Sequence, residues 1–121
     1  MSGAVIDTNV LVSGLLNPAG GPGTVVSMVL SGQITVWYAG GILCEYMDVL
    51  NRKAFSFDEA DVETLLEFIR RKGVAATFAT SRVPFKDESD RIFYDVAVSN
   101  GIPLVTDRKS TRLNSSHDQI S

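Results

Sequence analysis

The chain has 121 residues, of which 45% are hydrophobic, and this is enough for one domain with a buried core. Its formal net charge of −3 excludes a protein that holds nucleic acid through a large basic surface, so local basic clusters or metal ions would have to offset the acidic balance. No apolar run approaches the roughly 20 residues that span a bilayer, and no basic segment typical of a signal peptide precedes the first strand. The single cysteine, Cys44, has no partner for an intramolecular disulfide, so we expect a reducing, cytoplasmic location without membrane attachment.

Hydrophobic periodicity predicts strands and helices that follow one another along the chain. A short apolar strand at 4–6 ends abruptly in Asp7, and apolar residues then resume at helical spacing. A loop rich in proline and glycine covers 17–23. The other predicted strands are 34–39, 74–78 and 102–106, and the predicted helices span about 9–16, 24–30, 42–50, 57–72 and 87–100. This alternation indicates a parallel sheet of about four strands with helices on both faces, an α/β/α sandwich.

Capping signals accompany these helices. Thr24 is a candidate N-cap of the second helix. The segment 56–59 matches the capping-box pattern Ser-x-x-Glu ahead of the fourth helix. Gly32 and the Asn-Gly pair at 100–101 predict where the second and fifth helices end.

Acidic residues stand just after a strand or in the first turns of a helix, where the carboxyl ends of parallel strands converge. These residues are Asp7, Glu45, Asp87, Glu88 and Asp90. Gathered carboxylates repel one another unless a cation neutralises them, and Mg²⁺ and Mn²⁺ are hard ions that prefer oxygen ligands. An ion held in this way suits hydrolysis of phosphodiester bonds, and it would bridge an acidic protein to a polyanion. Zinc is not expected, because the sequence has no cysteine–histidine cluster.

The stretch Val-Ile-Asp-Thr-Asn-Val-Leu-Val-Ser at 5–13 resembles the opening motif of the PIN-domain nucleases. The resemblance continues, in order, with Glu45 in its helix, Arg-Lys-Ala-Phe at 52–55, the acidic stretch 86–97 and Pro-Leu-Val-Thr at 103–106. It covers residues 3–106. The branch to which the chain is most similar consists of toxin components of prokaryotic toxin–antitoxin systems.

This resemblance implies a PIN-like domain and a Mg²⁺- or Mn²⁺-dependent endoribonuclease. The family's catalytic and metal-binding acids match Asp7, Glu45 and Asp90, and Asp87 is a candidate fourth ligand. The supporting polar pair after the first aspartate corresponds to Thr8 and Asn9, of which the second would orient that aspartate or a metal-bound water. The implied partners are RNA, a cognate antitoxin protein and, often, a second copy of the chain.

The pattern of the chain changes at residue 107. Residues 107–121 are polar and aperiodic, and they resemble the translation of a sequencing adapter, with a natural disordered tail as the alternative. We therefore expect one domain at 1–106, truncated at its C-terminus, followed by a non-native tail. The family continues after the position of Thr106 with glycine and then asparagine or aspartate, so we expect the last loop acid to be missing.

Each candidate residue also has a purely structural interpretation. Asp7 is a normal N-cap residue, and Glu45 matches a solvated helix position. Asp87 and Ser89 are candidate N-caps, and Glu88 would favour the N-terminal dipole of its helix. The remaining expectations concern burial: Asp95 is expected to be solvated, Cys44 to be buried, and Tyr46 and Phe93 to lie in the core.

Two other functions remain open from the sequence. One is a catalytically inactive PIN scaffold that binds RNA or a partner. The other is a receiver-type phosphoacceptor domain, which also gathers acids around Mg²⁺ at the edge of a parallel sheet. The second alternative would need an acidic pair after the first strand, whereas Asp7 is followed by Thr8 and Asn9.

Overall fold

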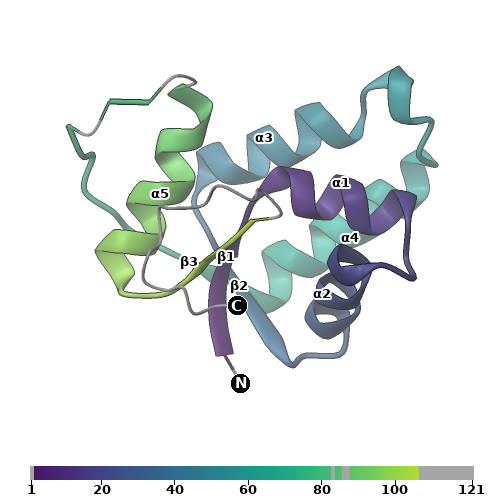
Figure 1. Ribbon diagram of the computed structural model, residues 1–121, viewed down its shortest axis with the longest axis horizontal. Coiled ribbons are helices and arrows are strands. Elements are labelled where there is room, and N and C mark those ends of the chain that lie inside the picture. The colour runs from purple at the N-terminus through teal and green to yellow at the C-terminus, as the bar shows by residue number, and fades with distance from the viewer. Residues whose placement is uncertain (1, 83, 86–87, 107–121) are drawn as a thin grey trace.

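A four-stranded parallel sheet forms the centre of the structure (Figure 1). The computed structural model describes residues 2–82, 84, 85 and 88–106, apart from the side chains of Glu88 and Ser89. Expectations for Asp87 and for residues 107–121 lie outside these residues. The strands are β1 (Ser2–Ile6), β2 (Ile34–Tyr38), β3 (Val74–Ala75) and β4 (Leu104–Val105), in the spatial order β3-β2-β1-β4.

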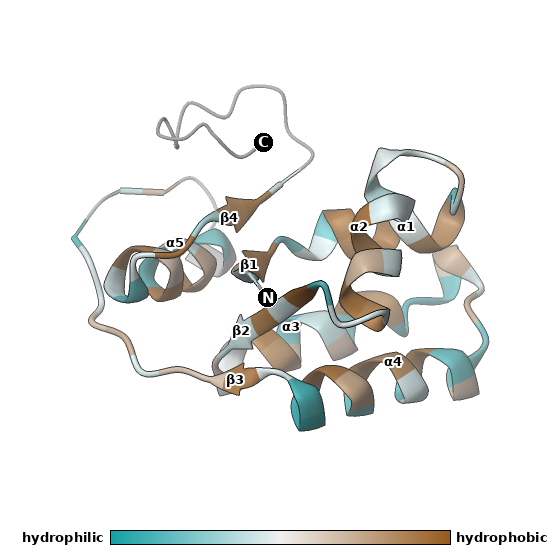
Figure 2. Ribbon diagram, turned by 90° about the horizontal axis from the view of Figure 1, so that it is seen from below, coloured by the Kyte–Doolittle hydropathy of each residue, from teal (hydrophilic) through white to brown (hydrophobic). Residues whose placement is uncertain are grey.

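Helices cover both faces of this sheet, as the alternation of the sequence predicts. Figure 2 shows α5 on one face and the other helices on the opposite face. The helices are α1 (Thr8–Leu16), α2 (Gly21–Leu30), α3 (Gly40–Leu50), the short 3₁₀ helix η1 (Lys53–Phe55), α4 (Glu59–Lys72) and α5 (Glu88–Asn100). The element order β-α-α-β-α-α-β-α-β matches the prediction, and the class is α/β.

The core lies between β1 and the helices on either side of it. Val5 and Ile6 are fully buried, as are Leu11 of α1, Ile42 of α3 and Val96 of α5. β1 is buried on both faces because it is a central strand, and this explains its continuous apolar run. Within the described part of the chain, no helix has the length and apolar character needed to cross a membrane.

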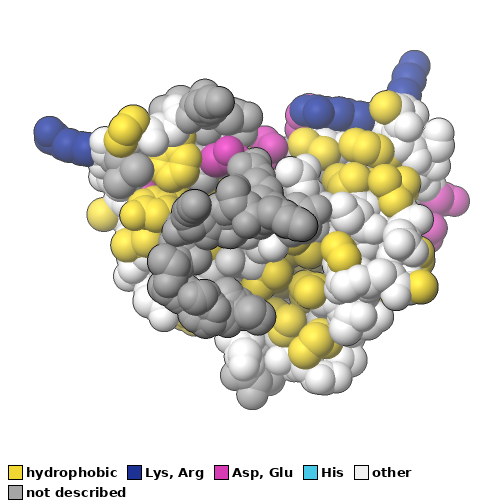
Figure 3. Space-filling view, in the orientation of Figure 1, with side chains coloured by type: hydrophobic (Ala, Val, Ile, Leu, Met, Phe, Trp, Pro, Cys, Tyr) yellow, Lys and Arg dark blue, Asp and Glu magenta, His cyan; other side chains and the backbone are white. Residues whose placement is uncertain are grey.

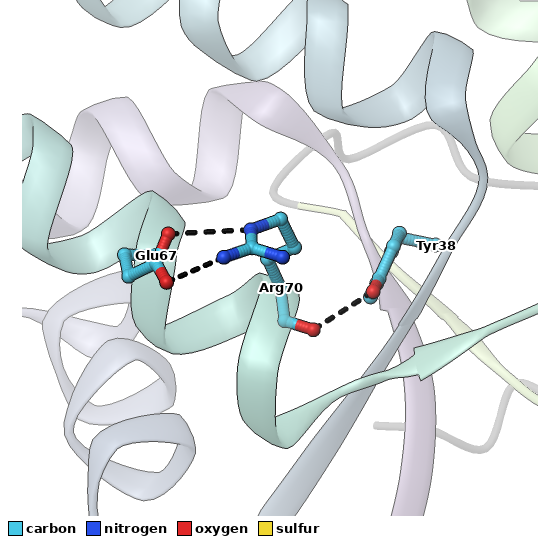
Figure 4. Close-up of polar contacts among 3 residues, drawn as sticks. All are labelled: Tyr38, Glu67 and Arg70. Atoms are coloured by element: carbon cyan, nitrogen blue, oxygen red, sulfur yellow. Dashed lines mark hydrogen bonds and ion pairs between the residues drawn. The ribbon is translucent and has the colours of Figure 1, made fainter.

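A hydrogen bond from β2 connects the sheet to α4. The hydroxyl of Tyr38, in β2, donates a 2.8 Å hydrogen bond to the carbonyl of Arg70 near the end of α4 (Figure 4). The guanidinium of Arg70 in turn donates to both carboxylate oxygens of Glu67, one turn earlier, and these bonds raise the pKa of Arg70. The position of α4 therefore depends on a buried tyrosine, whereas the ion pair between Arg70 and Glu67 lies at the surface.

Two predicted helix starts are wrong. α2 begins at Gly21, with proline in its first turn, so Thr24 lies inside the helix and its hydroxyl bonds back to the carbonyl of Gly20. The N-cap of α4 is Asp58, whose carboxylate accepts a 2.8 Å hydrogen bond from the amide of Ala60. Ser56, the expected cap, instead ends η1 in a left-handed conformation.

The third strand is shorter than predicted. β3 has two residues, against the expected range 74–78. The backbone that follows is bound by side chains of α5 instead of a strand: Asn100 donates to the carbonyl of Thr77, and Ser99 accepts from the amide of Ala79. Because these polar groups replace the strand ladder, the chain leaves the sheet early and runs along α5. β4 is likewise limited to two residues.

Burial agrees with prediction for two side chains and differs for two others. Tyr46 and Phe93 are buried and in ring contact, with centroids 6.0 Å apart. Cys44, expected in the core, is exposed because it lies on the outer side of α3. Asp95, expected in solvent, is only 2% exposed.

Candidate functional site at the carboxyl ends of β1 and β4

The sheet has a topological switch point between β1 and β4. The chain proceeds outward from β1 through β2 to β3, and then returns to place β4 on the other side of β1. In open α/β sheets, ligands bind in the crevice outside the carboxyl ends of the strands at such a point. Asp7 follows β1 and Thr106 follows β4, so both residues lie at this position. In a flavodoxin-like receiver fold β1 would instead lie between β2 and β3, so the strand order excludes the receiver alternative.

Asp7 is held by both neighbouring elements. Its amide donates a 2.9 Å hydrogen bond to the carbonyl of Val105, which extends the β1–β4 pairing by one residue. Its carboxylate oxygen Oδ2 accepts a 3.0 Å hydrogen bond from Thr106 Oγ1. Its other oxygen, Oδ1, accepts from the amide of Asn9 over 3.4 Å, which is long for a hydrogen bond. Asp7 therefore serves as the N-cap of α1, and its weakly bonded Oδ1 retains the capacity to bind a ligand.

The polar pair after Asp7 divides between the interior and the surface. Thr8 is only 4% exposed, and its hydroxyl is buried without a hydrogen-bond partner in the described structure. Asn9 is exposed. A buried hydroxyl without a partner is uncommon in folded proteins and calls for an explanation. A bound water that forms a hydrogen bond with this hydroxyl would explain it.

Tyr46 fixes α3 against the end of β1. Its hydroxyl donates a buried 2.6 Å hydrogen bond to the carbonyl of Ile6, the residue before Asp7. Burial is the main cause that raises the pKa of Tyr46, and the negative charge of Asp7 adds to it, while the bond to Ile6 acts in the opposite direction. Glu45 precedes Tyr46 in α3 and is half-buried. The tyrosine thus places the segment of α3 that carries Glu45 beside the end of β1.

Asp90 lies in the first turn of α5 and is half-buried. α5 contacts both β1 and α3, so the three elements that carry Asp7, Glu45 and Asp90 adjoin one another. Figure 3 shows acidic side chains close together near the start of α3, where α5 approaches it. Among the described residues, however, no three acidic, histidine or cysteine side chains form a group that could hold a metal ion. Asp87 and the side chain of Glu88 are not among those residues.

The donor set agrees in kind with Mg²⁺ or Mn²⁺. The carboxylates of Asp7, Glu45 and Asp90 are hard oxygen ligands. The structure therefore brings together the elements that carry Asp7, Glu45 and Asp90, but among the described residues it shows no group of three side chains that could hold a metal ion. The roles of Asp7, Glu45, Asp90, Thr8 and Asn9 remain predictions.

Two residues at this site have roles that sequence reasoning missed. The sequence predicts Thr106 as the last residue of the strand 102–106, whereas it directly follows β4 and its hydroxyl bonds to Asp7. Tyr46 was assigned to the core on its apolar spacing, and its hydroxyl gave no sign that it would bond to β1.

Comparisons with known proteins add one result. A family model described as a PIN domain matches residues 3–107. The searches of curated proteins and of solved structures found no match.

Proposed function

Because the chain belongs to the PIN-domain family, whose members are generally nucleases, we propose that it is a Mg²⁺- or Mn²⁺-dependent endoribonuclease. Asp7, Glu45 and Asp90 would hold the metal, and Asp87 would be a fourth ligand. Divalent metals are typical of the family. The finer assignments, to RNA and to these residues, are part of the proposal.

One observation carries this proposal: the hydrogen bond between Thr106 and Asp7 at the switch point of the sheet. It orients a carboxylate at the place where open α/β sheets bind their ligands. Tyr46 holds α3 at the same end of β1, and α5 contacts both elements. This arrangement supports the proposal because the elements that carry Asp7, Glu45 and Asp90 adjoin one another.

The chemistry divides between the metal and the chain. A bound divalent ion supplies an activated water and stabilises charge on the phosphate oxygens. The chain orients Asp7 through Thr106 and keeps the phenol of Tyr46 neutral beneath it. The net charge of −3 would otherwise repel RNA, so binding of the polyanion is expected to depend on the metal as well.

The proposal is tested by incubating the protein with single-stranded RNA in Mn²⁺, in Mg²⁺ and in EDTA, beside its Asp7→Asn variant. Asparagine remains a good N-cap, so the variant should keep its fold while losing the charged ligand. We expect cleavage in the presence of metal, none in EDTA, and none by Asp7→Asn. Cleavage that survives EDTA, or equal cleavage by a purified variant, would contradict the mechanism.

A catalytically inactive scaffold is the second candidate. It is favoured by the absence of a group of three metal-ligating side chains among the residues that the structure describes. RNA binding measured by fluorescence anisotropy separates the two functions. A folded protein that binds RNA without cleaving it in either metal would support the scaffold.

We also propose that the nuclease is the toxin of a cytoplasmic toxin–antitoxin pair, with a cognate antitoxin protein and a homodimer as its assemblies. The support is the sequence resemblance of the motifs around Asp7, Glu45 and Asp90. Growth arrest on expression of the wild-type chain, with none on expression of Asp7→Asn, is the expected result. Equal growth of both strains at equal protein levels would contradict the toxin role.

A further inference from the structure

Asp95 is a carboxylate buried in an unusual setting. It lies within α5 and is 2% exposed, among the buried apolar residues Phe93, Val96 and Ala97. Its Oδ2 accepts a 3.1 Å hydrogen bond from the amide of Ser81. Its Oδ1 is buried without a hydrogen-bond partner in the part of the chain that the structure describes.

This setting is unfavourable for stability alone. A buried carboxylate is costly unless both of its oxygens are paired. A leucine would fill the same space without this cost, but it would leave the Ser81 amide without its acceptor. An aspartate with one orphaned oxygen therefore indicates a requirement other than packing.

Ser81 is bound a second time by the same helix. Arg91 Nη1 donates to the carbonyl oxygen of Ser81 over 2.7 Å and to its hydroxyl over 3.1 Å. The Arg91 guanidinium also lies 5.3 Å from the centre of the Phe85 ring, a cation–π distance. Arg91 and Asp95 are four residues apart, so they lie one turn apart on the same face of α5. Ser81 therefore joins two successive turns of the helix.

The contacts of Ser81 reach the first turn of α5 through Arg91. Arg91 follows Asp90 directly, and both belong to the first turn of the helix. First turns lack intrahelical partners for their amides and fray unless side chains hold them. Asp95 fixes Ser81 from the second turn, and Ser81 provides the oxygen atoms that hold Arg91.

We infer that Asp95 is a positioning residue, which acts through Ser81 and Arg91 to hold the first turn of α5 and its Asp90 at the nuclease site. The effect on catalysis rests on the proposed function. The effect on Ser81 does not, because it is a property of the folded chain alone.

The first experiment measures hydrogen exchange at the Ser81 amide by NMR in the wild type and three variants. Asp95→Leu removes the acceptor, and the amide should exchange about tenfold faster or more. Asp95→Asn keeps an acceptor oxygen and should exchange like the wild type. Asp48→Asn, which removes an exposed charge on α3, is the matched control and should also exchange like the wild type. An unchanged exchange rate in Asp95→Leu would overturn the inference.

The second experiment measures RNA cleavage by the same proteins. A displaced acid lowers kcat and leaves KM nearly unchanged, and we expect a loss of about tenfold to a hundredfold in Asp95→Leu. Asp95→Asn should restore most of the activity. Faster exchange at Ser81 with an unchanged kcat would overturn the positioning role, as would a loss of kcat that asparagine leaves unrepaired.

Two further outcomes are also informative. If Asp95→Leu does not fold, Ser81→Pro removes the other partner of this hydrogen bond, because proline has no amide proton. The amides next to position 81 should then exchange faster than in the wild type, and kcat should fall as expected for Asp95→Leu. If the wild type itself does not cleave RNA in either metal, the proposed function fails and the catalytic role of Asp95 fails with it. The exchange rate of Ser81 then decides separately whether Asp95 holds this segment.

Discussion

Thr106 Oγ1 donates a 3.0 Å hydrogen bond to Asp7 Oδ2 and so joins two residues that lie 99 positions apart in the sequence. Each residue directly follows a strand, and the two strands pair in register, with Val5 opposite Leu104 and Ile6 opposite Val105. The bond is therefore a consequence of strand pairing: wherever β1 and β4 pair in this register, the two side chains meet at the carboxyl edge. It gives the first acid of the site a defined orientation.

Removing this bond should affect activity more than stability. Thr106→Val keeps the shape of the side chain and removes the donor to Asp7. We expect kcat for RNA cleavage to fall about tenfold, because the carboxylate loses its orientation, and the free energy of unfolding to fall by less than about 1.5 kcal/mol. Cleavage assays and urea denaturation measure the two effects. Thr64→Val, at an exposed position of α4, is the control and should cleave normally. A fully active Thr106→Val would show that the bond does not orient the acid.

The hydroxyl of Tyr46 should contribute to stability through a single bond. Tyr46→Phe removes the 2.6 Å hydrogen bond to the Ile6 carbonyl and leaves that buried oxygen without its donor. The expected loss is about 1–3 kcal/mol in the free energy of unfolding, the usual cost of such a buried group. Urea denaturation at pH 7 is the measurement. A variant as stable as the wild type would mean that water replaces the phenol in this position.

The same residue predicts a pH dependence at alkaline pH. Burial, and then the charge of Asp7, raise the pKa of Tyr46, so it stays protonated in the folded protein above the usual tyrosine pKa of about 10. The unfolded chain releases this proton from about pH 10 upward, so the folded state binds more protons there and stability falls as pH rises. The advantage of the wild type over Tyr46→Phe should therefore shrink above pH 10, by up to about 1.4 kcal/mol per pH unit. Denaturation curves for both proteins between pH 8 and 11 test this, and a constant difference would contradict it.

Two glycines in the first turn of α2 should respond oppositely to alanine. A Cβ at Gly23 would lie 2.1 Å from the carbonyl oxygen of Pro18, whereas a Cβ at Gly21 would meet nothing within 4 Å. Gly23→Ala should lower the free energy of unfolding by about 1–3 kcal/mol through overpacking. Gly21→Ala, the matched control, should be neutral or stabilise by up to about 1 kcal/mol. Thermal melts compare the two, and equal melting temperatures would show that the loop before α2 yields readily.

The sequence reasoning fails for Asp95 because its hydrogen-bond partner comes from another segment of the chain. Asp95 lies outside the apolar stripe of its helix, which predicts solvent, but the segment after β3 covers that side and brings the Ser81 amide to it. Ser56 differs for a local reason: η1 ends there, and the carboxylate of Asp58, two residues later, accepts the capping hydrogen bond. Local patterns contain no information on which face a second element will cover.

The order and type of the elements, the α/β class and the position of Asp7 at the end of a buried strand can all be predicted from local sequence patterns. They follow from the two-residue and 3.6-residue periodicities and from polar residues at strand ends, which are properties of neighbouring residues. Three contacts became visible only in the folded chain: Thr106 with Asp7, Tyr46 with the end of β1, and Asp95 with Ser81. Each of these contacts requires strand pairing or helix packing between segments that are distant in sequence, and such contacts are set by how all the apolar faces are buried together.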